Sequence, residues 1–387
     1  MSIPKLRFKE FHENWIESRL SELALKITDG THDTPIVQKE GMPFLTAINI
    51  KDGFINYHDI NYVDETTHKK IFERCNPEKD DLLIVNIGAG TATCARNIVD
   101  YPFSLKNVAL VKPNKKLLNP VFLEQFQRKN SAKLFVSLTS GGAQPFLSLK
   151  EIGKLVVKYS SLEEQTKIAS FLSAVDEKIS QLNQKHELLS QYKQGMMQKL
   201  FSQQIRFKAD DGSEFEEWEN LYIGDLCKIT TGNKDTQNKV NNGAYPFFVR
   251  SQTVEQINSY SMDCEAVLTS GDGVGVGKNY HYINGKFDFH QRVYCLYNFS
   301  EIVLGKYLYI YFSSFFYDRV KRLSAKNSVD SVRMDMISKM QIQLPCLEEQ
   351  IKISNFFSAI DQKIEVVAQQ IEQANQWKKG LLQQMFV

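Results

Sequence analysis

The segments whose composition suggests enzyme chemistry lack the spacing that such chemistry needs. The clearest is Gly271-Asp272-Gly273-Val274-Gly275-Val276-Gly277-Lys278, which has the composition of a phosphate-binding loop. The pattern G-x-x-x-x-G-K-[ST] requires a first glycine and a final hydroxyl residue, but Asp272 and Asn279 stand at these positions. The segment does not fit G-x-G-x-x-G either. We interpret it as a loop that makes a tight turn or brings backbone close to a partner.

Other candidate catalytic groups fail on spacing as well. Asn76-Pro77 is followed by Glu78, so the N-P-P-F/Y signature of amino-methyltransferases is absent. Asp176-x-Lys178 and Asp361-x-Lys363 lie in helical patterns, where residues i and i+2 point apart, so a nuclease carboxylate–lysine pair is not expected. The seven histidines form no H-E-x-x-H cluster, and the six cysteines lack C-x-x-C spacing, which indicates reduced thiols rather than a zinc site. The sequence predicts no catalytic site, metal or cofactor in this chain.

Composition sets the class of protein. A length of 387 residues suggests two or three domains, and 42% hydrophobic residues is ordinary for a soluble protein. No apolar run approaches the roughly 18 to 20 residues of a membrane span, and the segment Met1 to Lys5 does not resemble a signal peptide. We therefore expect a cytoplasmic protein. The net charge of +2 does not indicate a nucleic-acid partner by itself, but a local basic face is enough to contact phosphates.

A long helical segment occurs twice and sets the architecture. One copy begins at Leu162-Glu163-Glu164-Gln165 and the other at Leu347-Glu348-Glu349-Gln350, and about half of roughly 40 aligned positions are identical. Apolar residues recur in steps of four and three, as in a coiled-coil seam. The seams are Ile168, Leu172, Val175, Ile179, Leu182, His186 and Leu189 in the first copy, and Ile353, Phe357, Ile360, Ile364, Val367, Ile371 and Ala374 in the second.

These seams predict that the two helices pair with each other as an antiparallel coiled coil. A helix of about 40 residues is roughly 60 Å long, which exceeds what one compact domain requires. The alternative is two separate amphipathic helices, each packed on its own domain. His186 replaces the Ile371 of the second copy, and we interpret it as a tolerated polar seam residue, because no second histidine or cysteine lies at metal spacing.

The repeat extends upstream of the helices. Arg7-Phe8 leads to Trp15 in the first half, and Arg206-Phe207 leads to Trp218 in the second. Each half therefore has a lead-in, a divergent globular region and a long helix. The expected organisation is a globular domain over 1–155, a central helix over 156–205, a second globular domain over 206–340 and a C-terminal helix over 341–387, and the divergence of the two globular domains suggests two different recognition surfaces. The fold class is α+β with an internal pseudo-two-fold repeat.

Both globular regions are expected to be mixed α/β and large enough to bury a core. Strands are predicted at Pro43–Ile48, Asp81–Val85, Asn107–Val111, Ala266–Thr269 and Arg292–Leu296. Turns are predicted at Asp29-Gly30, Asp52-Gly53, Asn242-Gly243 and Asn284-Gly285. Helices are predicted at 120–138 and 305–323, before each long helix.

In combination these motifs resemble the DNA specificity subunit of type I restriction-modification systems. The resemblance covers essentially the whole chain. It rests on the helix pattern L-x-E-Q-x-K-I-x-x-F-L/F-S-A-x-D, on Trp15…Leu20-x-x-Leu23…Ile27 and Trp218…Ile223-x-x-Leu226…Ile229, on Ile27 to His32 with Pro43-Phe44-Leu45, and on Gly271 to Lys278 with His290-Gln291-Arg292-Val293. One departure is Asp80-Asp81-Leu82-Leu83-Ile84, where the family more often has G-D-x-L-I, and it puts only the local turn in doubt.

The resemblance implies a subunit that is not an enzyme. Two recognition domains would each read one half of a split double-stranded DNA target, and the paired helices would set the gap between the halves. The helices would also dock two methyltransferase subunits, to which the restriction (translocase) subunits add. S-adenosylmethionine, ATP and magnesium are then expected on those partners and not on this chain.

Polar loop residues are the candidates for DNA contact, because their side chains suit base edges and phosphates. In the first domain they are Thr31, His32, Asp33, Thr34, Gly88, Thr91, Thr93, Arg96, Asn97, Ser140 and Gln144. In the second they are Lys234, Arg250, Ser251, Gln252, Gly273, Lys278, His290, Gln291, Arg292, Lys326 and Asn327. Each could also be an ordinary solvated loop residue, and the basic cluster Arg128, Lys129 and Lys133 could simply face solvent.

Two other classes of protein remain open at this point. One is a coiled-coil adaptor that joins proteins and never touches DNA. The other is a stand-alone restriction enzyme or methyltransferase, which the missing motifs disfavour.

Overall fold

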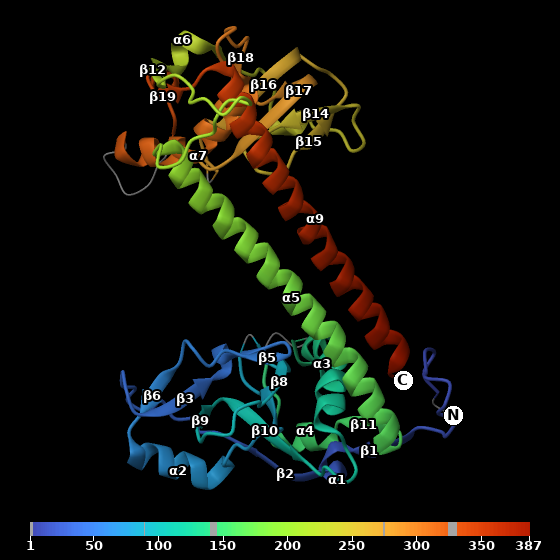
Figure 1. The fold of residues 1–387 in the computed structure, drawn as a ribbon. Coiled ribbons are helices and arrows are strands. Elements are labelled where there is room, and N and C mark those ends of the chain that lie inside the picture. Colours follow the sequence, from blue (N-terminus) through green and yellow to red (C-terminus); the bar gives the residue numbers. More distant parts are fainter. Residues whose placement is uncertain (1–2, 89, 140–144, 274, 324–330) are drawn as a thin grey trace. The chain divides into compact units, whose positions relative to one another are not determined.

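The computed structural model describes residues 3–88, 90–139, 145–273, 275–323 and 331–387. The chain divides into two compact units, which we describe separately (Figure 1). Unit 1 comprises Met1–Lys185 with Val367–Val387, and unit 2 comprises His186–Val366. The long helices α5 (Leu162–Phe201) and α9 (Leu347–Met385) each contribute one part to either unit. Their bounds agree with the repeat predicted from the sequence. None of the described helices is long and apolar enough to cross a membrane.

Unit 1 is built on a sheet in the order β2-β10-β7-β8. These strands are β2 (Ala24–Asp29), β10 (Val108–Pro113), β7 (Leu82–Val85) and β8 (Cys94–Arg96). Both faces are covered, which explains the unbroken apolar run of β7. Leu82 and Ile84 face a core shared with helix α3 (Pro120–Thr139) and with α5, whereas Leu83 and Val85 face a second core.

The second core of unit 1 belongs to the divergent part of the domain. A sheet in the order β6-β3-β9 pairs β3 antiparallel with β6 and parallel with β9. The elements here are β3 (Met42–Thr46), η1 (Ala47–Asn49), β4 (Ile50–Lys51), β5 (Phe54–Ile55), β6 (Asn61–Val63), α2 (Glu65–Cys75) and β9 (Ser104–Lys106). The strand predicted at Pro43–Ile48 ends early, because Thr46 N–H donates to Asn49 Oδ1 (2.9 Å) and opens the 3-10 turn.

Unit 2 repeats this frame with a larger sheet, in the order β13-β18-β16-β17-β14-β15. The strands are β13 (Lys228–Thr231), β14 (Tyr245–Phe248), β15 (Glu255–Ile257), β16 (Met262–Ser270), β17 (Tyr280–Phe289) and β18 (Val293–Tyr297), with η2 (Thr236–Asn238) between β13 and β14. Helix α7 (Gly305–Leu323) covers one face through Tyr307, Leu308 and Phe312 (Figure 1). The order β13-β18-β16-β17 corresponds to β2-β10-β7-β8 of unit 1.

Each unit is closed by a small strand pair beside two short helices. In unit 1 these are β1 (Ile16–Arg19) with β11 (Val156–Tyr159), and α1 (Leu20–Leu23) with α4 (Leu149–Lys154). In unit 2 they are β12 (Glu219–Tyr222) with β19 (Gln341–Leu344), and α6 (Ile223–Leu226) with α8 (Met334–Ser338). Residues 156–159 thus form a strand, and the central helix begins only at Leu162.

One predicted turn is wrong. Asn284-Gly285 lies inside β17, where Asn284 pairs with Glu265 and Gly285 with Cys264 of β16. The chain reverses instead at the glycine-rich segment between β16 and β17. Gly285 has φ +143°, so the glycine allows an irregular strand conformation rather than a reversal. Asp52-Gly53 does form the turn between β4 and β5, with Gly53 at φ +77°.

The turn at Asp80 keeps the conformation that glycine would favour. Asp80 has φ +78°, and its backbone N–H donates to Asn97 O (2.8 Å). Aspartate tolerates the left-handed region better than most residues. The departure from the G-D-x-L-I pattern therefore leaves this turn intact.

The repeated E-Q motif fixes the start of each long helix. The guanidinium of Arg7 donates to the buried Glu164 (Nε–Oε1 2.7 Å, Nη2–Oε2 2.8 Å), and Arg206 donates in the same way to Glu349 (Nε–Oε1 3.3 Å, Nη2–Oε2 2.8 Å). We call these the helix-start pairs. They join the R-F lead-in to the helix in both units. This contact explains why the arginine and the glutamate both recur in the sequence repeat.

The adjacent glutamine caps the preceding helix in both units. Gln165 Oε1 accepts from Asn119 N–H and its Nε2 donates to two backbone carbonyls, while Gln350 Oε1 accepts from Leu304 N–H and its Nε2 does likewise. Both amides are fully buried. They satisfy backbone groups at the start of α3 and α7 that would otherwise lack partners.

Within each unit the segments of α5 and α9 are joined by an ion pair. Lys378 donates to Asp176 in unit 1, and Lys193 donates to Asp361 (2.5 Å) in unit 2. The predicted seam residues are buried or half-buried. In unit 1, Ile168, Leu172 and Val175 share a core with Leu381 and Met385. Each unit thus contains packed segments from both helices.

Candidate nucleic-acid interface

Two exposed arginines of unit 2 meet at one carboxylate. Asp272 follows β16, and its Oδ1 accepts from Arg250 Nη1 at 3.0 Å. Its Oδ2 lies 3.7 Å from Arg292 Nε. Arg250 follows β14 and Arg292 precedes β18, so three separate segments meet here. The side chain of Arg292 is 66% exposed, which leaves most of its donors free for a ligand.

His290 supports this cluster from inside. Its side chain is 3% exposed, and its Nδ1 accepts the backbone N–H of Arg292 at 2.9 Å, which places the ring proton on Nε2. Burial lowers the pKa of His290, and the neighbouring cations of Arg250 and Arg292 lower it further. Gln291 is exposed and donates through Nε2 to Asp235 Oδ2 (3.4 Å). His290 is therefore a support for Arg292 rather than a free reader.

The glycine-rich segment after β16 makes the tight reversal between β16 and β17, as one of the two sequence interpretations expected. Gly273 has φ +83° with open space around it, and Tyr280 Oη donates to Gly277 O at 2.5 Å. Lys278 lies at the end of this reversal with its Nζ 5.3 Å from the centre of the Tyr317 ring. The segment presents Lys278 and Asp272 at its two ends.

The remaining candidates of unit 2 have mixed placements. Gln252 is exposed, whereas the Ser251 carbonyl accepts from His281 Nε2 at 3.1 Å. Lys234 Nζ lies 3.9 Å from the buried Asp288 and is one-third exposed. Lys326 and Asn327 lie outside the described residues, as do Ser140 and Gln144 of unit 1.

Unit 1 also gathers donors around one carboxylate, but on a different element. Asp29 ends β2 and is 6% exposed; its Oδ2 contacts His32 Nε2 at 2.9 Å, and its Oδ1 accepts from Arg74 of α2. His32 Nδ1 lies 3.2 Å from Asn107 Oδ1. Arg74 was not predicted as a candidate, because it lies 45 residues from Asp29 and only the packing of α2 brings the two side chains together.

Thr31 to Thr34 form the exposed edge of this cluster. Thr31 Oγ1 accepts from the Asp33 backbone N–H at 3.1 Å, and Lys106 Nζ donates to Thr34 Oγ1. His32, Asp33 and Thr34 are exposed. These residues are therefore available to a ligand, together with Lys106 and Arg74.

A glycine at the same place in both units holds each cluster against the sheet. A Cβ on Gly30 would lie 2.0 Å from Leu105 O, and one on Gly232 would lie 2.0 Å from Phe289 O. Only glycine allows so close an approach of two backbones. Thr31, one residue after Gly30, and Lys234, two residues after Gly232, form parallel bridges to Lys106 and His290. The two units thus share this close backbone approach, although Asp29 follows β2 and Asp272 follows β16, which are not equivalent strands.

Several candidates of unit 1 serve the fold instead. Asn97 is fully buried, and its amide accepts from Tyr57 Oη (2.8 Å) and Val99 N–H and donates to Glu78 O and Val99 O. Burial raises the pKa of Tyr57 to about 12, so this hydroxyl remains a donor. Thr91 is also buried and donates to Gly88 O (2.6 Å). Thr93 and Gly88 complete the same reversal between β7 and β8.

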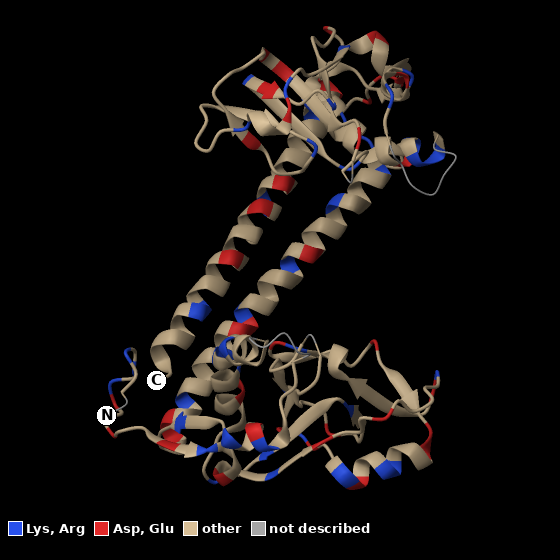
Figure 2. Ribbon diagram, turned by 180° about the vertical axis from the view of Figure 1, so that it is seen from behind, with Lys and Arg blue, Asp and Glu red and all other residues tan. Residues whose placement is uncertain are grey.

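The two arginines singled out in unit 1 are held by acids. Arg96 Nη1 donates to Asp80 Oδ1 (2.7 Å), and its Nε lies 3.7 Å from the buried Glu124. Arg128 is 13% exposed and bridges Asp52 and Asp176 (3.1 and 3.3 Å). Lys129 Nζ donates to Phe386 O, and only Lys133 of that basic cluster faces solvent. Basic residues elsewhere are interspersed with acidic ones in both units (Figure 2).

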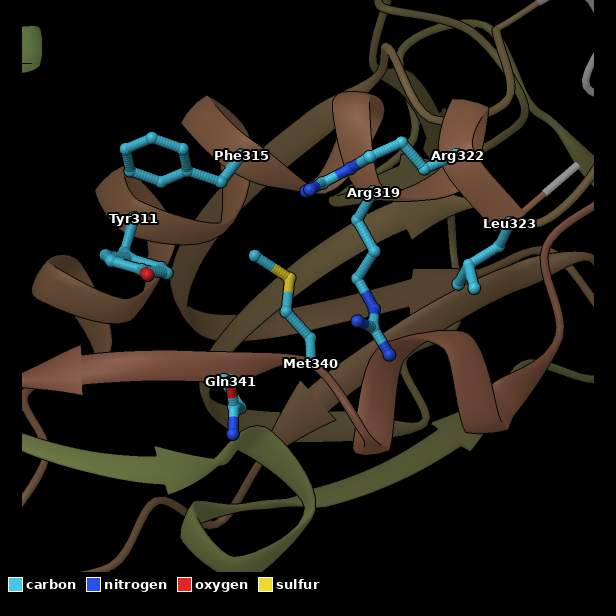
Figure 3. Close-up of a pocket in the computed structure, with 7 residues that line it drawn as sticks. All are labelled: Tyr311, Phe315, Arg319, Arg322, Leu323, Met340 and Gln341. Carbon is cyan, nitrogen blue, oxygen red and sulfur yellow. The ribbon is translucent and has the colours of Figure 1, made fainter.

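The described residues contain no metal site, and one cavity of unit 2 is lined by side chains that include a link between two elements of the fold. Among the described residues no group of three His, Cys, Asp or Glu could hold a metal ion. A cavity of about 440 Å³ in unit 2 lies between α7 and β19 (Figure 3). Its Arg319 donates to Met336 O and Lys339 O, both at 2.8 Å, and so joins α7 to the segment before β19. The cavity is lined by Tyr311, Phe315, Arg319, Arg322, Leu323, Met340 and Gln341.

Comparison with protein families gives one match over most of the chain. The model of the type I restriction modification DNA specificity domain matches residues 12–191 and again residues 215–376. The two matches coincide with the two halves of the sequence repeat.

Related proteins are described as specificity subunits of type I restriction enzymes. A putative type I restriction enzyme MjaX specificity subunit of Methanocaldococcus jannaschii is 24% identical, over 98% of this chain and 94% of that protein. The MjaVIII specificity subunit of the same organism is 26% identical, over 97% and 94%. The EcoDI specificity subunit of Escherichia coli is 29% identical over 43% of this chain, which spans 36% of that protein.

Solved structures share the fold. The S subunit of a type I restriction-modification system from M. genitalium superposes with a TM-score of 0.69 at 14% identity, covering 100% of this chain and 99% of the other. A chain from a structure of type I R-M complex assembly gives a TM-score of 0.55 at 15% identity, covering 97% and 98%. At these identities the likeness concerns the fold alone.

Proposed function

Because the chain belongs to the type I restriction modification DNA specificity family, we propose that each unit reads one half of a bipartite DNA target. Family membership assigns the chain to the specificity subunits and not to the catalytic ones, as the sequence predicted, and favours DNA recognition over the adaptor alternative. Methyl transfer and cleavage would then belong to partner subunits, together with S-adenosylmethionine, ATP and magnesium.

One observation carries the proposal. The same frame carries, at the ends of different strands in the two units, two donor clusters of different chemistry: Asp29 with His32 and Arg74, and Asp272 with Arg250 and Arg292. A shared frame with different exposed donors is what two readers of different half-sites require. Base edges in the major groove are distinguished by such donors and acceptors, while phosphate contacts fix the position.

We further propose that α5 and α9 pair as an antiparallel coiled coil that sets the gap between the half-sites. The support is the 4-3 seam together with the ion pairs Asp176–Lys378 and Asp361–Lys193, each of which joins one repeat copy to the other. Two readers on one stiff spacer convert two weak half-site affinities into one strong affinity.

A repeated aromatic cluster suits the docking of two identical partner subunits. In unit 1, the Phe171 ring lies 5.9 Å from Phe8 and 6.2 Å from Trp377. In unit 2, the equivalent Phe356 lies 5.7 Å from Phe207 and 6.4 Å from Tyr192. Trp377 and Tyr192 are 55% and 51% exposed, and aromatic residues of this kind anchor protein interfaces. We propose these two surfaces as methyltransferase docking points.

The test is a domain exchange. Residues of roughly 10–150 are replaced by the recognition domain of another family member, and the chain is expressed with its methyltransferase partner. Sequencing of the methylated motifs should reveal one changed half-site and one unchanged half-site. A change in both halves would refute independent readers, and the absence of any methylated motif with the unaltered chain would refute DNA reading.

The spacer is tested by lengthening it. Four residues inserted near Asn183 add one turn, about 6 Å of helix, and a base pair rises about 3.4 Å. The gap between half-sites should grow by about one to two base pairs, with both half-sites unchanged. An unchanged gap with full activity would mean that the helices do not set the spacing.

A further inference from the structure

Asp272 is an acidic residue placed among side chains that a DNA-binding surface would otherwise keep basic. Its Oδ1 accepts from Arg250 at 3.0 Å, and its Oδ2 lies 3.7 Å from Arg292. The exposed fractions of the three side chains are 26%, 43% and 66%, so the group is open to a ligand. A carboxylate here weakens attraction to phosphates, because its charge has the same sign as theirs. Attraction to DNA phosphates therefore does not explain why an aspartate stands at position 272.

The backbone just before Asp272 is held by hydrogen bonds, whereas the side chains of Arg250 and Arg292 are partly exposed. Gly271 N–H donates to Arg292 O, and Val332 N–H donates to Gly271 O, both at 2.7 Å. The Arg292 N–H is held by the buried His290 (2.9 Å). A free arginine side chain loses rotamer entropy when it binds a planar ligand, and a partner that holds it in advance reduces this loss. The Asp272 carboxylate is placed to do this for two arginines at once.

We infer that Asp272 is a positioning residue that aims Arg250 and Arg292 at guanine in the half-site read by unit 2. The inference rests on the proposed DNA-reading function and names its chemistry. Guanine presents O6 and N7 as neighbouring acceptors in the major groove, and the arginine fork matches them with two hydrogen bonds. A phosphate would also accept from arginine, but it carries no sequence information. The two ligands therefore predict opposite results when Asp272 loses its charge.

The test uses the full chain expressed with its methyltransferase partner and carrying Asp272→Asn. Binding is measured on the duplex selected by the unaltered complex, on duplexes with each base pair of the unit 2 half-site replaced, and on unrelated DNA. Preference for guanine should fall about tenfold at one or two positions, the size of a lost bidentate contact. Affinity for unrelated DNA should rise about threefold, as expected for removing one charge about 7 Å from a phosphate in water.

The matched control is Asp263→Asn, which makes the same charge change at the exposed start of β16. It should leave the base preference unchanged. Asp272→Glu, which keeps the carboxylate, should restore part of the preference, whereas a merely structural role would lower affinity for all DNA in each variant.

Three outcomes decide the inference. Lost guanine preference with stronger binding to unrelated DNA supports it. An unchanged preference in Asp272→Asn, or a preference lost equally in Asp263→Asn, overturns it. If the unaltered complex itself shows no preferred duplex, the proposed function fails, and that failure is distinct from the failure of the inference about Asp272.

Discussion

The two units share a frame, but the carboxylate at the centre of the donor cluster follows a different strand in each unit. In unit 1, Asp29 ends a strand of the central sheet and is 6% exposed, and its donors come from the following loop and from α2. In unit 2, Asp272 lies in the reversal after β16 and is 26% exposed, with donors from the segments after β14 and before β18. Between β15 and β16, where unit 2 is fully described, no helix corresponds to α2.

This difference separates what the frame must keep from what it can vary. The close approach at Gly30 and Gly232, the helix-start pairs and the glutamine caps recur in both units. The side chains that donate to the carboxylate differ between the two units, and so do the elements that carry them. A reader of this kind can therefore acquire a new preference by changing a segment such as α2, while every contact that holds the long helix stays in place.

The largest expected effect concerns the helix-start pairs. Glu164→Ala and Glu349→Ala each leave an arginine without its carboxylate partner and with only a backbone carbonyl (Glu13 O or Glu216 O) to accept from it, which costs about 3–5 kcal/mol in the unit concerned. The loss should be greater by about 1 kcal/mol in unit 2, because Trp218 Nε1 also donates to Glu349 (2.8 Å), whereas the buried Trp15 Nε1 has no partner among the described residues. Hydrogen exchange of peptides from each unit measures the two losses separately. Equal losses would show that the tryptophan bond contributes nothing.

The ion pairs between the long helices should also differ in strength. Lys378 is 7% exposed, and its partner Asp176, which is 34% exposed, also accepts from Gln125 and Arg128, so Lys378→Met breaks a connected and largely buried network. We expect a loss of about 2 kcal/mol in unit 1. Lys193 and Asp361 are 28% and 49% exposed, so Lys193→Met should cost no more than about 1 kcal/mol in unit 2. Thermal unfolding of the two variants, which carry the same substitution, tests this ranking.

Much of the frame was predictable, because it is repeated. The long helices, the helices 120–138 and 305–323 and most predicted strands follow from periodicity, and the structure confirms them. The turn at Asn284-Gly285 failed because a local pair of residues does not reveal that β16 and β17 pair across it over the length of both strands. Register is a property of two segments, and one segment alone does not contain it.

The candidate site was predictable only in part, for a related reason. Arg250, Arg292 and His32 lie at exposed ends of strands, where polar loop residues are expected. Arg96 and Asn97 looked the same in sequence but lie beside Asp80, Glu124 and Tyr57, which come from distant segments and turn them inward. Arg74 was missed because its contact with Asp29 depends on how α2 packs.

Arginines that look alike in sequence should therefore give different phenotypes. Arg292→Gln removes an exposed donor and should cost about 1–3 kcal/mol of discrimination at one base pair, with little effect on stability. Arg96→Gln should instead lower the stability of unit 1, because it leaves Glu124 buried with a weaker partner, and should leave base preference unchanged. Binding to single-substituted duplexes and unfolding by denaturant separate the two effects. A loss of base preference in Arg96→Gln would indicate that Arg96 contacts DNA after all.

The smallest expected effect is a pH dependence in unit 2. Burial lowers the pKa of His290 below its usual value of 6.5. As the pH falls through 6.5, His290 therefore binds a proton in the unfolded chain before it does so in the folded unit. The free energy of unfolding should therefore decrease with falling pH, by at most about 1.4 kcal/mol per pH unit for one proton, and level off below the folded pKa. His290→Asn retains an acceptor for the Arg292 N–H and removes this proton, so its unfolding free energy should depend less on pH between 7.5 and 5.5. The exposed His12→Asn is the control and should keep the slope of the unaltered chain. Hydrogen exchange in β16 peptides measures the slope of each protein. An identical slope in all three proteins would mean that His290 titrates alike in the folded and unfolded states and that its burial does not govern its charge.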